Sequence, residues 1–172
     1  MRKQKQKGFS LIELLIVVAI ILIIAAIAIP SLLRARITAN EASAVGSLRT
    51  INTSQVAYQT AYPSEGYAPS LLALGPPSGT GCSAPSSASA CLIDSSLANA
   101  GTTPKSGYVF AITAPGPLPN MTYIVGAAAS TFNQSGVRSF CSMEDGVLRA
   151  QAPTSQQAPV TTAAACGVFT AL

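Results

Sequence analysis

Hydrophobic residues follow different patterns in different parts of this chain. The first pattern is an apolar run from Phe9 to Ile29, in which only Ser10 and Glu13 are polar. A helix of 21 residues is about 31 Å long, enough to cross the hydrocarbon core of a bilayer. The run therefore predicts a membrane-length helix with one carboxylate near its beginning.

Beyond this run, the spacing changes to that of a half-buried helix. A stripe recurs at three- and four-residue intervals, through Val45, Leu48, Ile51, Gln55 and Tyr58. Such a stripe is typical of a helix that packs one face on a globular head. The polar residues Arg34, Glu41, Arg49 and Asn52 are expected elsewhere around the helix.

Two prolines limit the predicted helix. Pro30 removes one backbone hydrogen bond, so we expect a kink there in a helix over residues 9–61. Two separate helices that meet at Pro30 are the alternative. Pro63 disfavours helical backbone at Tyr62 and predicts the end of the helix.

The rest of the chain predicts a small antiparallel sheet. Residues 62–106 are rich in turn-forming residues, with one helical turn near residues 70–74. Short runs of apolar, aromatic and β-branched residues then predict three or four strands, over residues 108–113, 122–127, 137–142 and 147–150. The last two flank a tight-turn signal, Glu144-Asp145-Gly146. The expected fold is α+β: a long N-terminal helix packed on a 3–4-stranded antiparallel sheet.

These patterns give an expected division of the chain. Its parts are a basic leader (1–8), a membrane or assembly half of the helix (9–30), an amphipathic half (31–61), and a head (62–172) that consists of a loop (62–106), a sheet (about 107–150) and a C-terminal loop (151–172).

Charge separates the leader from the rest. Four of the ten basic residues are Arg2, Lys3, Lys5 and Lys7, and the other six are matched by six acids. No basic stripe therefore remains that would favour nucleic-acid binding. Basic residues before an apolar segment instead predict that the leader stays on the cytoplasmic side of a membrane.

Glu13 decides between three interpretations of the apolar run. A carboxylate within a membrane span costs about 2–3 kcal/mol, less near its end, so an ordinary anchor gains nothing from it. The same holds for a secretory signal peptide cut after Ala26-Ile27-Ala28. A cut between Gly8 and Phe9 would instead create an α-amine four residues before Glu13, a partner for its charge.

The residues around this junction resemble a known signal. Gly8-Phe9-Ser10-Leu11-Ile12-Glu13, after a short basic leader and before an apolar run, is similar to the signal sequence of type IV prepilins and pseudopilins. The resemblance is close over residues 1 to about 33 and looser over the helix–loop–strand layout. It implies cleavage after Gly8 and N-methylation of Phe9. It also implies that Glu13 pairs with the amine of an adjacent subunit during assembly, and that Pro30 bends the helix.

The resemblance also implies partners and a location. They are a prepilin peptidase/methyltransferase, inner-membrane assembly machinery, membrane lipid before assembly, and copies of the chain in a helical filament. The subunit would cross the inner membrane once, with its head outside the cytoplasm, and then enter an extracellular pilus or a periplasmic pseudopilus. Adhesion, motility, DNA uptake and secretion all remain open as roles. The alternatives are a pseudopilin of type II secretion and a monomeric membrane-anchored binding module.

The four cysteines allow three disulfide pairings. The shortest intervals favour Cys82 with Cys91 and Cys141 with Cys166, and the latter loop resembles the disulfide-bounded loop near the C-terminus of many type IV pilins. A metal site is less favoured, because histidine and Cys-x-x-Cys spacing are absent from the sequence. Disulfides predict an oxidising compartment.

The sequence contains no histidine, which excludes Ser-His and Cys-His nucleophiles. We therefore expect no catalytic residue, no cofactor and no metal, and a chain that is not an enzyme.

Overall fold

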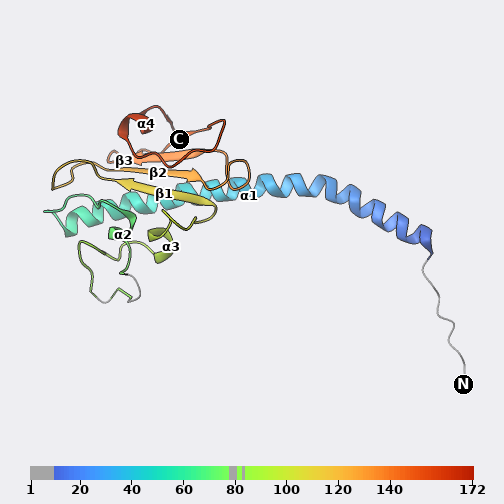
Figure 1. Ribbon diagram of the computed structural model, residues 1–172, viewed down its shortest axis with the longest axis horizontal. Helices are drawn as coiled ribbons and strands as arrows, with labels where there is room; N and C mark the ends of the chain where they lie inside the picture. The colour runs from blue at the N-terminus through green and yellow to red at the C-terminus, as the bar shows by residue number, and fades with distance from the viewer. Residues whose placement is uncertain (1–9, 78–80, 83) are drawn as a thin grey trace, which may run out of the picture. The chain divides into compact units, whose positions relative to one another are not determined.

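The computed structural model describes residues 10–77, 81–82 and 84–172 of the chain (Figure 1). It divides into two compact units, Met1–Arg36 and Ile37–Leu172. The helix α1 runs without interruption from Leu11 to Ala61 and contains Pro30. The alternative of two helices that meet at Pro30 is therefore wrong, because a proline removes a single backbone donor and the bonds on either side can continue. The kink at Pro30 stays a prediction.

In the first unit, α1 is uncovered. Between residues 11 and 29 the large apolar side chains are from 44% (Val18) to 76% (Leu11) exposed. Of the described helices, α1 is the one long and apolar enough to cross a membrane. A single soluble chain rarely exposes so much continuous apolar surface, so this segment needs lipid or other helices around it.

In the second unit, one face of α1 belongs to the core of the head. Leu48, Ile51, Gln55 and Tyr58 are at most 1% exposed, as the spacing predicts, and Val45 is partly buried. The buried Gln55 amide is satisfied by one backbone group: its Nε2 donates to the Ala68 carbonyl at 3.1 Å, and the Ala68 N–H donates to its Oε1 at 2.8 Å. The buried face of α1 thus contains apolar side chains and also Gln55, whose amide binds the loop that follows the helix.

The head contains a five-stranded antiparallel sheet in the order β1-β2-β3-β4-β5. Its strands are β1 (Tyr108–Thr113), β2 (Ile124–Ala129), β3 (Ser139–Met143), β4 (Arg149–Gln151) and β5 (Thr170–Ala171). Tyr108 pairs with Ala129, and Ile124 pairs with Met143. The α+β fold with a long helix packed on an antiparallel sheet is therefore confirmed.

The C-terminal segment differs from expectation. Residues 151–172, expected to be a loop, contain the helix α4 (Ala163–Gly167) and β5, so the sheet has five strands rather than three or four. Thr162 caps α4, because its Oγ1 accepts the Ala165 N–H at 3.3 Å. A strand of two residues shows no alternation, and β5 is instead recruited by pairing with β4.

A close backbone contact holds the segment between β4 and α4 across the sheet. Gly126 in β2 lies so near the backbone of Val160 that a Cβ at this position would overlap it. Gln156 secures the same segment, since its Nε2 donates to the Ala129 carbonyl at 2.6 Å and its Oε1 accepts the Phe132 N–H at 2.7 Å.

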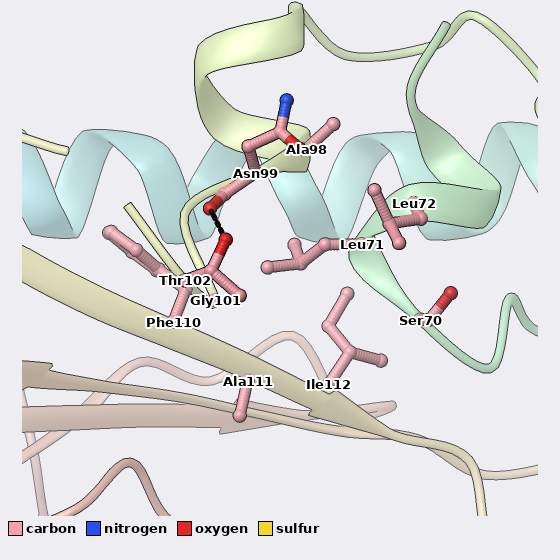
Figure 2. Close-up of a pocket in the computed structure, with 10 residues that line it drawn as sticks. All are labelled: Ser70, Leu71, Leu72, Ala98, Asn99, Gly101, Thr102, Phe110, Ala111 and Ile112. Atoms are coloured by element: carbon pink, nitrogen blue, oxygen red, sulfur yellow. Dashed lines mark hydrogen bonds between the residues drawn. The ribbon is translucent and has the colours of Figure 1, made fainter. Parts of the chain in front are cut away.

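The segment before the sheet forms two short helices beside β1, α2 (Leu71–Leu74) and α3 (Ser95–Ala98) (Figure 2). The first matches the predicted turn, whereas the second lies in a stretch expected to be irregular. Both are capped by side chains: Ser70 Oγ accepts the Ala73 N–H, and Asp94 Oδ1 accepts the Leu97 N–H.

Candidate assembly and processing site

The beginning of α1 is fixed by Glu13. The Ser10 N–H donates to Glu13 Oε2 at 2.9 Å, and the Leu14 N–H donates to the Ser10 carbonyl at 3.2 Å. In a Ser-x-x-Glu capping box, the glutamate reaches back to the backbone N–H of the first residue in this way. Sequence reasoning assigned Glu13 an assembly role and missed this local one, although the motif is readable from residues 10–13.

Glu13 can still accept further donors. Its side chain is exposed in the single chain, and an ionised carboxylate offers about four acceptor positions on two oxygens. The two other residues predicted for processing, Gly8 and Phe9, lie outside the described residues. The structure therefore places the carboxylate at the first turn of α1, next to the predicted junction in sequence.

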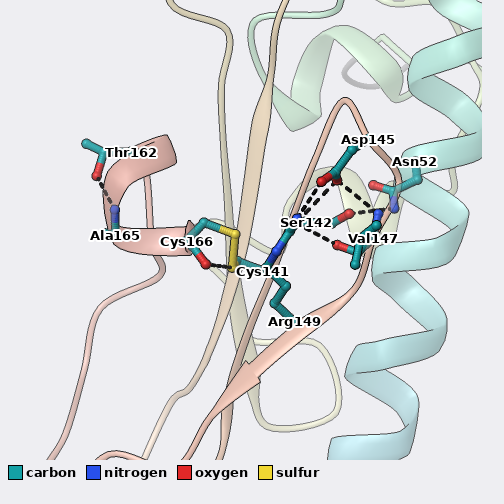
Figure 3. Close-up of a disulfide and its surroundings, with 9 residues drawn as sticks. All are labelled: Asn52, Cys141, Ser142, Asp145, Val147, Arg149, Thr162, Ala165 and Cys166. Atoms are coloured by element: carbon teal, nitrogen blue, oxygen red, sulfur yellow. Dashed lines mark hydrogen bonds and ion pairs between the residues drawn. A yellow bond between two sulfur atoms is a disulfide. The ribbon is translucent and has the colours of Figure 1, made fainter. Parts of the chain in front are cut away.

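The four cysteines lie in two pairs, Cys82 with Cys91 and Cys141 with Cys166, each with 5.8 Å between the Cα atoms. This is the pairing that the shortest intervals favour. Figure 3 shows that the second pair joins β3 to α4. Both of its cysteines are fully buried, beside Ile124 and Phe169 in a small apolar cluster. The bridge thus attaches the C-terminal segment to the sheet.

Glu41 connects α1 to the loop between β2 and β3. Its Oε1 accepts the N–H groups of Val137 at 3.1 Å and Arg138 at 3.0 Å, and its Oε2 accepts Arg138 Nε at 2.8 Å. The Glu41 side chain is 8% exposed and that of Arg138 is 44% exposed. The expectation that Glu41 lies away from the buried face is therefore wrong, because these three donors compensate its burial.

The Glu41 carboxyl is held in its ionised form. Burial opposes ionisation, but the N–H donors of Arg138 and Val137 and the positive charge of Arg138 outweigh it, so the pKa of Glu41 is lowered. The neighbouring Asn40 of α1 contacts the same loop, since its Nδ2 donates to the Ser135 carbonyl at 2.8 Å. This turn of α1 is thus tied to the head by polar contacts.

A second polar network lies further along α1, where the helix faces β3 (Figure 3). Asn52 Nδ2 donates to Ser142 Oγ at 2.9 Å, and the Tyr123 hydroxyl donates to Asn52 Oδ1 at 3.0 Å. Burial raises the pKa of Tyr123, so this phenol is a neutral donor. Asn52 therefore stabilises the packing of α1 against β3 through these hydrogen bonds.

The acidic turn between β3 and β4 also forms an ion pair within the chain. Asp145 forms an ion pair with Arg149, and the hydrogen bond from Arg149 lowers the pKa of Asp145. Over residues 10–77, 81–82 and 84–172, no three Cys, Asp or Glu side chains gather as ligands of a metal ion would.

Comparison with known proteins bears on the N-terminal segment. Residues 3–29 match the family model of the prokaryotic N-terminal methylation motif. Over 53 residues the chain is 53% identical to the type IV wide pilus major component PilA4 of Thermus thermophilus. The chain is thus similar, over a part of its length, to a type IV pilus component. No solved structure matches the chain significantly.

These matches cover only a part of this chain. The aligned region is 31% of this chain and 40% of the length of the Thermus protein. The match to the methylation motif contains the predicted junction and Glu13.

Proposed function

We propose that this chain is a structural subunit of a type IV pilus-like filament, made as a prepilin, cut after Gly8 and methylated on the new amine of Phe9. The observation that carries the proposal is the match of residues 3–29 to the N-terminal methylation motif. The pilus component of Thermus thermophilus supports it, because the similarity extends over 53 residues. The role is structural rather than enzymatic.

The physical chemistry of α1 is consistent with assembly. Its N-terminal residues expose a continuous apolar surface that lipid covers before assembly and neighbouring α1 helices cover afterwards. A lone carboxylate and a lone amine are each unfavourable in such surroundings, and a pair of them is less so. We propose that Glu13 pairs with the methylated amine of Phe9 of an adjacent copy and so sets the axial register.

The proposal implies an order of partners. A prepilin peptidase/methyltransferase acts first, on a subunit that crosses the inner membrane once with its head outside the cytoplasm. Inner-membrane assembly machinery then transfers the subunit from lipid to the filament. The two disulfides suit a head that folds in an oxidising compartment.

Mass analysis of the mature N-terminus tests the proposal. The expected result is a chain that begins with methylated Phe9, and a Gly8→Lys variant that stays uncut. A mature chain that begins at Ile29 would show signal-peptidase cleavage and reject the pilin function.

The location of the filament, on the cell surface or in the periplasm, needs a separate test. Cells that express the chain are sheared, and the released fraction is inspected by electron microscopy. Surface filaments that contain this chain are expected. Filaments found in the periplasm and missing from the sheared fraction would instead assign the chain to the pseudopilins.

A further inference from the structure

The uncovered part of α1 has charged residues at both ends of its apolar surface. Glu13 precedes the apolar residues 14–33, and Arg34 and Arg36 follow them. All three side chains are exposed. From Glu13 to Arg34 the helix rises by about 31 Å, which matches the hydrocarbon core of a bilayer at about 30 Å. When Arg34 lies at the headgroups of one leaflet, Glu13 therefore lies at the edge of the other.

Arg34 and Arg36 project from opposite sides of α1. At about 100° per residue, the two positions are about 200° apart around the helix axis. A protein partner that packs on one side of the helix contacts one of them and misses the other. A layer of lipid headgroups surrounds the helix and contacts both. The placement of the two charges therefore favours a membrane surface over a protein surface.

The sequence near this pair contains no acid that would neutralise it. The nearest acids along the chain are Glu13 and Glu41, and Glu41 forms an ion pair with Arg138 at 2.8 Å. Ion pairs along a helix join residues three or four positions apart, and neither acid has this spacing from Arg34 or Arg36. This end of the apolar surface thus has two positive charges, which anionic headgroups attract.

Arginine is chemically suited to a position at the edge of a bilayer. Its guanidinium stays charged, and it binds two oxygens of a phosphate through parallel hydrogen bonds. Its aliphatic stem lies along apolar surface while the charged end reaches the headgroups. A phosphate ligand therefore fits both the charge of this pair and its position after a membrane-length helix.

We propose that Arg34 and Arg36 bind lipid phosphates in the leaflet on the side of the head and thereby set the depth of α1 in the membrane. The inference rests on the membrane-bound stage of the proposed function. Before processing, the four basic residues of the leader outnumber this pair and keep the predicted orientation. A cut after Gly8 removes them, and Arg34 and Arg36 are then the first basic residues of the chain. The pair keeps Glu13 at the opposite edge of the bilayer after the leader is lost.

The reaction rate of a cysteine near the pair tests this depth. The four native cysteines are in disulfides, and none of the described residues is a free cysteine. Ser31→Cys therefore supplies the reactive thiol, about 4.5 Å before Arg34 along the helix. The processed chain is purified from membranes and reconstituted in vesicles of equal amounts of phosphatidylcholine and phosphatidylglycerol. A charged maleimide that cannot cross the bilayer is added, and the rate constant is measured, because it does not depend on how many heads face outward.

Replacing both arginines by glutamine should let the helix sink into the bilayer. Each basic residue near an anionic surface strengthens the attraction about fivefold, so the Arg34→Gln and Arg36→Gln pair should slow the reaction of Ser31→Cys by about 30-fold. The Arg34→Lys and Arg36→Lys pair keeps both charges and should stay within about threefold of the unsubstituted pair. Arg49→Gln changes an exposed arginine of α1 within the head and should have no effect. In detergent all these chains should react at the same rate.

A lipid without phosphate tests the ligand. The arginine and glutamine pairs are compared again in vesicles of digalactosyldiacylglycerol, whose headgroup is an uncharged sugar. The difference between the two rates should be about fivefold smaller there. An equal difference in both lipids shows that the arginines only avoid hydrocarbon, and it overturns phosphate binding.

The anchor and the proposed function fail in different ways. Equal rates for the arginine and glutamine pairs in phosphatidylglycerol vesicles overturn the anchor, while the function stands if mass analysis shows methylated Phe9. If mass analysis finds the leader still present, the proposed processing fails, and the same comparison on the full chain decides the anchor separately. A chain that alkaline carbonate washes off the vesicles does not cross the bilayer, and then both fail.

Discussion

The contact between Glu41 and the β2–β3 loop makes a quantitative prediction about the head. In Glu41→Ala, the partly buried N–H groups of Val137 and Arg138 lose their acceptor. Each stranded donor costs about 1–3 kcal/mol. The guanidinium of Arg138 is 44% exposed and returns to water at little cost. Because both N–H groups are only partly buried, the lower part of this range applies, and we expect a loss of about 2–4 kcal/mol in the free energy of unfolding.

The control breaks an ion pair that is more exposed than the pair of Glu41 and Arg138. Lys105→Ala removes the Lys105–Asp94 pair, whose side chains are 26% and 57% exposed, and should cost at most about 1 kcal/mol. The measurement is denaturant unfolding of the full chain in detergent, followed by the near-ultraviolet dichroism of its tyrosines. Tyr58, Tyr108 and Tyr123 are in the core of the head and report on its packing. Equal stability of Glu41→Ala and Lys105→Ala would refute the reasoning.

The same contact predicts a pH dependence. The pKa of Glu41 is lowered in the folded head, so the unfolded state binds the proton more readily. The stabilisation is therefore fully present above the unfolded pKa of about 4.3 and is lost as the pH falls through the folded value. Glu41→Gln should lose less stability than the wild-type head between about pH 5 and pH 2. Parallel pH profiles for the two chains would contradict the assignment.

Three further predictions concern other parts of the chain. Cys141→Ser should destabilise the head by about 3.5 kcal/mol and Cys82→Ser by about 2.7 kcal/mol on the loop-entropy model, with non-reducing peptide mapping of the wild-type chain showing the two bridges. Gly126→Ala should cost about 1–3 kcal/mol in thermal unfolding, because its Cβ would overlap the backbone of Val160, whereas alanine at the open position Gly46 should be tolerated. Glu13→Val should enter the membrane and be cut normally but fail to form sheared filaments; abundant filaments would refute the charge pairing.

The sequence predicted correctly the elements whose ends are set by residues that are close in the chain. The residues of β1 form one run of strand-forming side chains bounded by Gly107 and by Ala114-Pro115, and the observed strand matches the prediction of 108–113. In contrast, β2 covers 124–129 rather than 122–127. Thr122 and Tyr123 are stronger strand formers than the alanines that replace them. Pairing with β1 decides the position, because strand propensity depends on the neighbouring strand.

Contacts between distant residues were not predictable in this way. Glu41 breaks the apolar stripe of α1, and its burial depends on donors that lie 96 and 97 residues away in the sequence. The strand β5 likewise depends on β4 and on the bridge from Cys166 to Cys141. Periodicity reports which face of a helix is apolar, whereas it does not report where a partner for a buried charge comes from.

Glu13 shows how the local and the functional interpretations combine. In a single chain the Glu13 carboxylate caps the helix by accepting the Ser10 N–H. Helix caps contribute about 0.5–2 kcal/mol to stability. A charged residue in the span costs about 2–3 kcal/mol, so the cap offsets a part of this cost. Glutamine would serve the same capping box without a charge. The cap thus explains a polar side chain at this position and leaves the charge unexplained, which is why Glu13→Gln, with the cap kept and the charge removed, should insert and be processed but not assemble.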